Sequence, residues 1–331
     1  MFRWVHRGRG ATLAEVIITT SVFSFMVLSL FAIMRFGVRS WRNIESKAEV
    51  QTQLRKVELS LLPDLKAASY AGMEVALITD SGAATTSGTT SSSFDSSNRT
   101  GHGNVIWFLS AINTDGKFSR DSDGNAQWSS TTDNDRRGLF ERLDTGQNQG
   151  QPDYHRAVLY YCIRPTNTAF RQRFQYDHPC ESKPDVSSAN PIQSDTQWST
   201  SQSQYDDYCP HQWLIRKEIK LNPAQSEAAS LPTLDEIKPF LTQPGDKKLT
   251  EMFSETSTDS SGQQISVLDA DVLADSLVVF RAAMVKPEVL VDVKAFRALE
   301  SGDILAIGRQ ALSSSTFTVQ YDARVVPNNS I

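Results

Sequence analysis

The sequence lacks the short motifs that mark the common catalytic sites. It contains no G-x-S-x-G, H-E-x-x-H, G-x-x-x-x-G-K-[ST] or dinucleotide-binding G-x-G-x-x-G pattern, each of which places a nucleophile, a metal or a phosphate in a defined local geometry. A membrane-anchored hydrolase would rest only on the generic presence of serine, histidine and aspartate. We therefore expect a protein that is not an enzyme.

Cysteine is also scarce, since the 331 residues include only Cys162, Cys180 and Cys209. The C-x2–4-C and H-x3–5-H spacings of structural zinc sites are absent, although His178-Pro-Cys180 and Cys209-Pro-His211 form a mirrored pair. A Cys180–Cys209 disulfide suits an oxidising compartment, with zinc or unbridged thiols as the alternatives. Cys162 lies in an apolar run, which predicts a small core residue.

The net charge of −5 argues against general nucleic-acid binding, because an acidic surface repels phosphates. The first ten residues carry Arg3, Arg7 and Arg9 and no acid, so the rest of the chain has a net charge of −5 minus 3, or −8. We expect no nucleic-acid partner.

Charge is almost absent from residues 11–34, where Glu15 is the single charged side chain among 24 residues. About 20 apolar residues cross a bilayer core as a helix, and Thr and Ser hydroxyls can bond to carbonyls of the same helix. The basic residues before this segment favour a cytoplasmic N-terminus. A secretory signal would have a shorter apolar region, and a plain single-pass anchor would not explain the costly position of Glu15.

Residues 10–17, GATLAEVI, resemble the cleavage motif of type IV prepilins. In that family a peptidase cuts after the glycine, the new N-terminal residue is methylated and the fifth mature residue is glutamate. The resemblance implies processing between Gly10 and Ala11, with Glu15 as the fifth mature residue. The sequence departs from the family pattern at Ala11, where phenylalanine is usual, and at Ala14, where isoleucine or leucine is common.

The resemblance also implies a role in assembly for two charged groups. Cleavage would give Ala11 an α-amine that is mostly cationic at pH 7, and Glu15 lies four residues later on the same helix face. In filaments of the family this glutamate meets the amine of a neighbouring subunit, since a buried carboxylate needs a partner. The implied partners are a prepilin peptidase, other pilin or pseudopilin subunits, an inner-membrane assembly platform and membrane lipid.

The helix is predicted to continue beyond the membrane to about residue 62, with Pro63 ending or kinking it. Apolar residues recur mostly at spacings of three or four, with Gln51 interrupting, and charged residues fill the other faces. This pattern predicts an amphipathic stripe that faces a core, with Trp41 also near the outer membrane interface. The stripe comprises Val38, Trp41, Ile44, Ala48, Leu54, Val57, Leu61 and Leu65.

Six later segments have the composition of strands. Residues 213–219 alternate apolar and polar, which predicts a half-buried strand, and residues 277–280 and 289–296 form a pair joined through Lys286-Pro287. The other three segments are 105–109, 157–163 and 317–326. A long helix followed by strands predicts an α+β, pilin-like fold with the helix packed on an antiparallel sheet. Residues 277–296 and 323–329 resemble strands of J-type minor pseudopilins and W-type minor pilins.

Long polar segments separate the predicted strands. Residues 81–101 are rich in Gly, Ser and Thr, which predicts a flexible loop, and insertions around 112–152 and 222–266 favour a minor subunit over a major one. Asp121, Asp123 and Asn125 are a calcium candidate that departs from the EF-hand pattern, and a surface turn is the alternative. No other cofactor is expected.

The predicted organisation is a basic leader (1–10), the transmembrane half of the helix (11–34), its amphipathic half (35–68) and a β-rich globular domain (69–331). We expect a minor pilin or type II secretion minor pseudopilin in the inner membrane, with its N-terminus in the cytoplasm and its globular domain in the periplasm. The alternative is a single-pass anchored extracytoplasmic binding or sensor domain, in which Gly10 could be changed freely.

Overall fold

The chain divides into two compact units, Met1–Ala48 and Glu49–Ile331. The computed structural model describes residues 12–78, 84–86, 104–114, 118–120, 126–128, 138–143, 149–163, 173, 212–221, 230–241, 256–258, 262, 264–285, 288–298 and 316–327.

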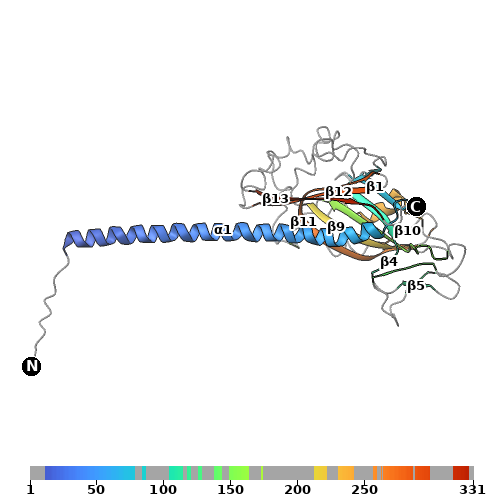
Figure 1. Cartoon of the computed structure of the whole chain (residues 1–331), viewed down its shortest axis with the longest axis horizontal. Coiled ribbons are helices and arrows are strands. Elements are labelled where there is room, and N and C mark those ends of the chain that lie inside the picture. Colours follow the sequence, from blue (N-terminus) through green and yellow to red (C-terminus); the bar gives the residue numbers. More distant parts are fainter. Residues whose placement is uncertain are drawn as a thin grey trace, which may run out of the picture. The chain divides into compact units, whose positions relative to one another are not determined.

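A single helix, α1 (Leu13–Ala67), contributes 55 residues and belongs to both units (Figure 1). Pro63 lies inside α1, so the prediction that it could end the helix was wrong. Proline removes the hydrogen bond to the carbonyl four residues earlier. That carbonyl belongs to Leu59, whose side chain is exposed, and water can therefore hydrate it.

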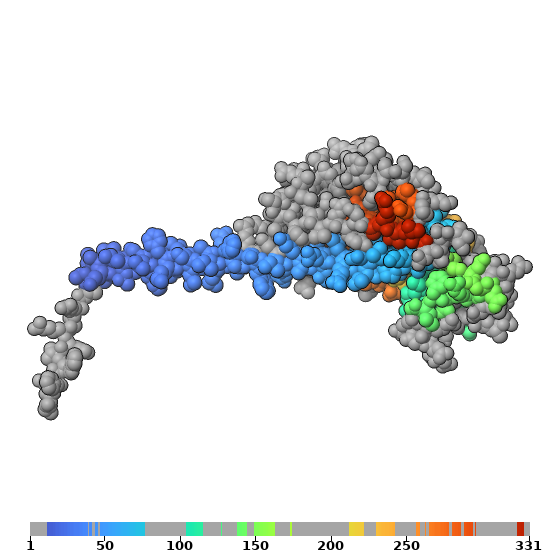
Figure 2. All heavy atoms as spheres, viewed as in Figure 1, coloured from blue at the N-terminus to red at the C-terminus, as the bar shows by residue number. Residues whose placement is uncertain are grey.

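The first unit contains a stretch of α1, Leu13–Val38, that is long and apolar enough to cross a membrane. Its large apolar side chains are exposed within the chain (Figure 2). The end of this stretch and the residues after it differ from the prediction. The side chains of Val38, Trp41 and Ile44 are 52%, 70% and 61% exposed and belong to neither core cluster of the described residues.

Helix geometry explains this correction. Six residues separate Ala48 from Leu54, and at about 100° per residue this step rotates the side-chain direction by about 240° beyond one full turn. The predicted stripe is therefore two stripes on different faces of α1. The second stripe is buried in the second unit and comprises Val50, Leu54, Val57, Leu61 and Leu65.

The second unit is built on a nine-stranded sheet in which every pairing is antiparallel (Figure 1). Its order is β13-β12-β11-β9-β8-β3-β1-β2, and β10 also pairs with β11. The strands are β1 (Met73–Ile78), β2 (Ala84–Thr86), β3 (Val105–Ser110), β8 (Arg156–Ile163), β9 (Gln212–Lys220), β10 (Thr256–Thr258), β11 (Gln264–Val285), β12 (Glu288–Ala298) and β13 (Thr316–Val325).

Four short strands form two separate pairs. These are β4 (Ile112–Asn113) with β7 (Leu139–Phe140) and β5 (Phe118–Arg120) with β6 (Ala126–Trp128). The prediction of an α+β fold, with a long helix and an antiparallel sheet, is confirmed.

All six predicted strand segments coincide with strands of the sheet, although 317–326 extends one residue beyond β13. β11 pairs with β12 up to Val285 and Glu288, as the predicted hairpin requires. The prediction of about six strands was too low. It missed β1, the first half of β11 and the three-residue strands β2 and β10. Apolar and polar residues do not alternate over the whole length of β1 or of the first half of β11.

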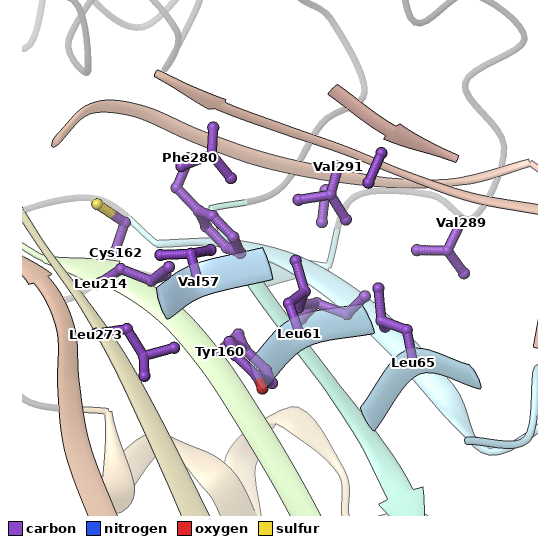
Figure 3. Close-up of a cluster of buried hydrophobic side chains, with 14 of the residues drawn as sticks. Val57, Leu61, Leu65, Tyr160, Cys162, Leu214, Leu273, Phe280, Val289 and Val291 are labelled. Atoms are coloured by element: carbon purple, nitrogen blue, oxygen red, sulfur yellow. The ribbon is translucent and has the colours of Figure 1, made fainter. Parts of the chain in front are cut away.

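The sheet is buried on both faces, which divides the core into two clusters. On one face, Val57, Leu61 and Leu65 of α1 point into side chains of the sheet such as Tyr160 and Phe280 (Figure 3). On the other face, α5 (Leu234–Ile237) and the 3-10 helix η2 (Lys238–Phe240) cover an aromatic cluster that includes Trp107, Tyr161 and Trp213.

The prediction of a half-buried strand at residues 213–219 was therefore wrong. Lys217 and Glu218 in β9 are fully buried, since α1 covers one face and α5 with η2 covers the other. The Lys217 ammonium donates to the carbonyl of Phe240 and lies 5.5 Å from the centre of the Tyr161 ring. A buried ammonium needs such partners.

Candidate functional site at the start of the N-terminal helix

Glu15 lies in the first turn of α1 and caps the start of the helix. Its Oε2 accepts hydrogen bonds from the backbone N–H of Thr12 at 2.9 Å and from the Thr12 hydroxyl at 3.1 Å, and the Glu15 N–H donates to Thr12 Oγ1 at 3.3 Å. This reciprocal arrangement is a capping box, which satisfies backbone donors that have no partner within the helix.

Sequence reasoning missed this role, although its signal was present. Thr12-Leu13-Ala14-Glu15 is an S/T-x-x-E pattern before an apolar run. The capping box gives the Glu15 carboxylate a partner within its own chain. Glu15 can therefore be tolerated at the edge of a bilayer, where an unpaired carboxylate would be costly.

The hydroxyl groups of the apolar span follow the prediction. Each of five side chains donates to the carbonyl four residues earlier, so the helix hides these polar groups from lipid. The donors are Thr19, Thr20, Ser21, Ser24 and Ser29.

Apart from Glu15 and Cys162, the predicted site residues lie outside the part of the chain that the structure describes. Gly10 and Ala11, the proposed processing residues, lie outside the described residues, as do Cys180 and Cys209 with their neighbours His178 and His211. The calcium candidates Asp121, Asp123 and Asn125 also lie outside them. Cys162 is confirmed as a core residue, where its thiol donates to Gln212 Oε1 at 2.8 Å.

A second polar cluster lies where α1 packs on β8 and β9. Arg216 binds Asp64 of α1 through Nε at 2.8 Å and also pairs with Glu218, which in turn binds Arg156 at 2.8 Å. The Tyr160 hydroxyl donates to Asp64 Oδ2 at 2.5 Å. The Arg156 and Glu218 side chains are completely buried. This chain of paired charges fixes the last turns of α1 on the sheet.

The cluster shifts the pKa of two of its members. Burial raises the pKa of Tyr160 well above 10.0, and the neighbouring Asp64 carboxylate adds to that rise. Burial lowers the pKa of Arg216, but Asp64 and Glu218 more than offset this, so the pKa of Arg216 is raised. Sequence reasoning could not find the cluster because its members are far apart in the chain.

Tyr160→Phe should change how stability depends on pH. The folded-state pKa of Tyr160 lies above its unfolded value of 10.0, so its contribution is fully present below pH 10.0 and falls as the pH rises above that value. At pH 7 we expect the free energy of unfolding of the variant to be about 1.5–3 kcal/mol below that of the wild type, because the hydrogen bond to a charged group is lost. Between pH 10 and 11 the free energy of unfolding should fall less in the variant than in the wild type. Urea unfolding in detergent at both pH values measures this, and equal alkaline losses would contradict it.

Among the described residues, no group of three or more His, Cys, Asp or Glu side chains is arranged to hold a metal ion. The described chemistry is therefore that of a capped apolar helix and a buried ion-pair cluster. No protein-family model, curated protein or solved structure matches this chain.

Proposed function

We propose that this chain is a pilin-like subunit, made as a prepilin and held in the inner membrane by the first part of α1. A prepilin peptidase would cut between Gly10 and Ala11, and the mature chain would join or prime a type IV pilus or a type II secretion pseudopilus. The J-type or W-type minor subunits are the classes it resembles most. In this role the protein is not an enzyme.

The observation that carries the proposal is the place of Glu15 in α1. It is the single charge in residues 11–34 and occupies the first turn of a 55-residue helix, five positions after the proposed cleavage. The first part of that helix is a membrane-length apolar span, and the last part packs on an antiparallel sheet. This order of elements is the ground plan expected of a pilin-like chain.

The capping box suggests how Glu15 could act before and during assembly. In the isolated chain its carboxylate binds Thr12. Cleavage would create a cationic amine at Ala11 of each subunit, and a charged partner binds a carboxylate more strongly than neutral donors do. An incoming subunit could therefore draw Glu15 from Thr12 to the amine of its neighbour.

The proposed orientation follows from prepilin processing rather than from charge alone. Arg3, Arg7 and Arg9 precede the span, but Arg35 lies near its other end and further arginines follow at positions 39 and 42. Basic residues therefore flank both ends, and the positive-inside rule does not decide between the orientations. A cytoplasmic peptidase site at Gly10 would place the globular unit in the periplasm.

The alternative is a single-pass anchored binding or sensor domain. The capping box favours this alternative, because capping the helix explains a glutamate at position 15 without a filament. The two functions differ in what they require of Gly10.

Gly10→Val and Gly8→Val form a matched pair that separates the two functions, because both change a glycine of the leader. With an active prepilin peptidase, we expect Gly8→Val to lose residues 1–10 as the wild type does, and Gly10→Val to keep them. A gel shift of the full chain reads this out. If the wild type and both variants kept residues 1–10, the result would favour the anchored domain.

A further inference from the structure

Positive charge is concentrated where the apolar span of α1 ends. Residues 16–44 contain Arg35, Arg39 and Arg42 and no other charged residue. The Arg35 side chain is exposed, and it forms no ion pair among the residues that the structure describes. The chain therefore places three cations on a short stretch of helix that holds no acidic residue to neutralise them.

The three arginines occupy one side of the helix. At about 100° per residue, position 39 is rotated by about 40° from position 35, and position 42 is rotated by about 20° in the other direction. The steps of four and three residues thus keep all three positions within about 60° of one another around the helix axis. We call Arg35, Arg39 and Arg42 the arginine stripe. It extends over about 10.5 Å along the axis.

The stripe begins at the depth of the lipid headgroups. Glu15 and Arg35 are the charged residues on either side of the uncharged stretch, and they are 20 positions apart. That separation corresponds to about 30 Å of helix, which is the thickness of the hydrocarbon core. Because a charge inside the core is costly, we expect these two residues at its two boundaries. The headgroup layer extends about 5–8 Å further, so Arg39 lies within it, and the long side chain of Arg42 can reach back to it.

A phosphate group is the partner that suits the chemistry and the depth of the stripe. Guanidinium groups stay charged at any physiological pH, and their paired N–H donors match two phosphate oxygens. In phosphatidylcholine a cation of the same headgroup offsets the phosphate charge, whereas phosphatidylglycerol keeps a net negative charge. Basic residues next to a membrane span are attracted to such anionic lipids. Glu45 lies three residues after Arg42, but an exposed pair on a helix surface is weak and competes little.

We propose that the arginine stripe binds the headgroups of anionic phospholipids at the end of the span that leads to the globular unit. Binding fixes the depth of the span and gathers anionic lipid around it. The proposal goes beyond the proposed function and does not depend on it, because the stripe is the same before and after cleavage at Gly10. A failure of lipid binding leaves leader processing untouched, and a failure of processing leaves the stripe untouched.

Photoaffinity labelling of the full, uncleaved chain in phosphatidylcholine proteoliposomes tests the lipid class. The vesicles carry a trace of phosphatidylglycerol or of phosphatidylcholine, each photoactivatable near its headgroup, and peptide masses locate the adducts. On residues 35–44 we expect phosphatidylglycerol adducts to exceed phosphatidylcholine adducts by more than about fivefold. Replacing all three arginines of the stripe by glutamine should bring this ratio to about one. Equal labelling by the two lipids in the wild type, or an unchanged ratio in the triple variant, would overturn the proposal.

The leader offers a matched control for net charge. Replacing Arg3, Arg7 and Arg9 by glutamine removes the same charge before the span. We expect this variant to keep the wild-type ratio of adducts on residues 35–44. A fall as large as that of the stripe variant would mean that total charge attracts the lipid, and would overturn a site at the stripe.

Exchanging two neighbouring residues tests the arrangement of the stripe at constant composition. Arg39→Ser combined with Ser40→Arg moves one cation by about 100° around the helix and by a single residue along it. We expect the ratio of phosphatidylglycerol to phosphatidylcholine adducts to fall by about two- to fivefold. An unchanged ratio would show that the lipid responds to the number of charges alone, and would overturn binding by one face of the helix.

Discussion

Arg216→Met should destabilise the globular unit by about 3–5 kcal/mol, because it leaves buried carboxylates without their shared cation. Arg216 binds Asp64 of α1 and Glu218 of β9, whose side chains are 10% and 0% exposed. Glu218 keeps Arg156 in the variant, whereas Asp64 keeps, among the residues that the structure describes, only the hydroxyl of Tyr160. Methionine is an unbranched side chain that fills much of the space of arginine. The loss of stability therefore measures mainly the removal of the positive charge.

Asp269→Asn is the matched control, because Asp269 also contacts Arg216, at 3.7 Å, but is 61% exposed. Exposed ion pairs contribute about 0–1 kcal/mol, and the control should stay within that range. Urea unfolding of the full chain in detergent, followed by tryptophan fluorescence, gives both values. A loss of less than about 1 kcal/mol for Arg216→Met would mean that the cluster does not hold α1 on the sheet.

Glu15→Gln should be cleaved normally and yet enter assemblies more than about tenfold less often. Glutamine can serve in a capping box as glutamate does, so the start of α1 is preserved. The variant loses the carboxylate that would pair with the Ala11 amine of a neighbouring subunit. A change of roughly 1.4 kcal/mol shifts an equilibrium tenfold, and leaving a buried charge unpaired costs well over that. The fraction of chain recovered in sheared filaments or detergent-resistant assemblies measures this.

Thr12→Ala provides the converse change. It removes the capping hydroxyl, which is worth about 1 kcal/mol, while keeping the Glu15 carboxylate. We expect assembly to fall by less than about fivefold. If Thr12→Ala reduced assembly more than Glu15→Gln, the capping box and not the charge would be the reason for Glu15.

The parts of the fold that follow from local patterns were predictable. Residues 105–109 and 157–163 are apolar runs bounded by polar segments, and each lies in a strand. The apolar span was equally clear, because a single charge interrupts 24 residues. In these segments burial is decided by composition alone.

The parts that depend on distant residues were not predictable. Lys217 is buried because η2, more than twenty residues later, supplies a carbonyl at Phe240. Arg216 is paired with Asp64, 152 residues earlier. The amphipathic stripe failed for a local reason instead, since the six-residue step from Ala48 to Leu54 changes the helix face. At Glu15 the capping pattern was present and was outweighed by the family resemblance.

The mass of the N-terminal peptide, after expression of the wild-type chain with an active prepilin peptidase, tests the central proposal most directly. We predict an N-terminus at Ala11 that carries one additional methyl group, and an unprocessed leader when the peptidase is absent. An intact leader in both preparations, with the same peptidase shown to cut a control prepilin, would contradict the proposal and leave Glu15 as the cap of a plain membrane anchor.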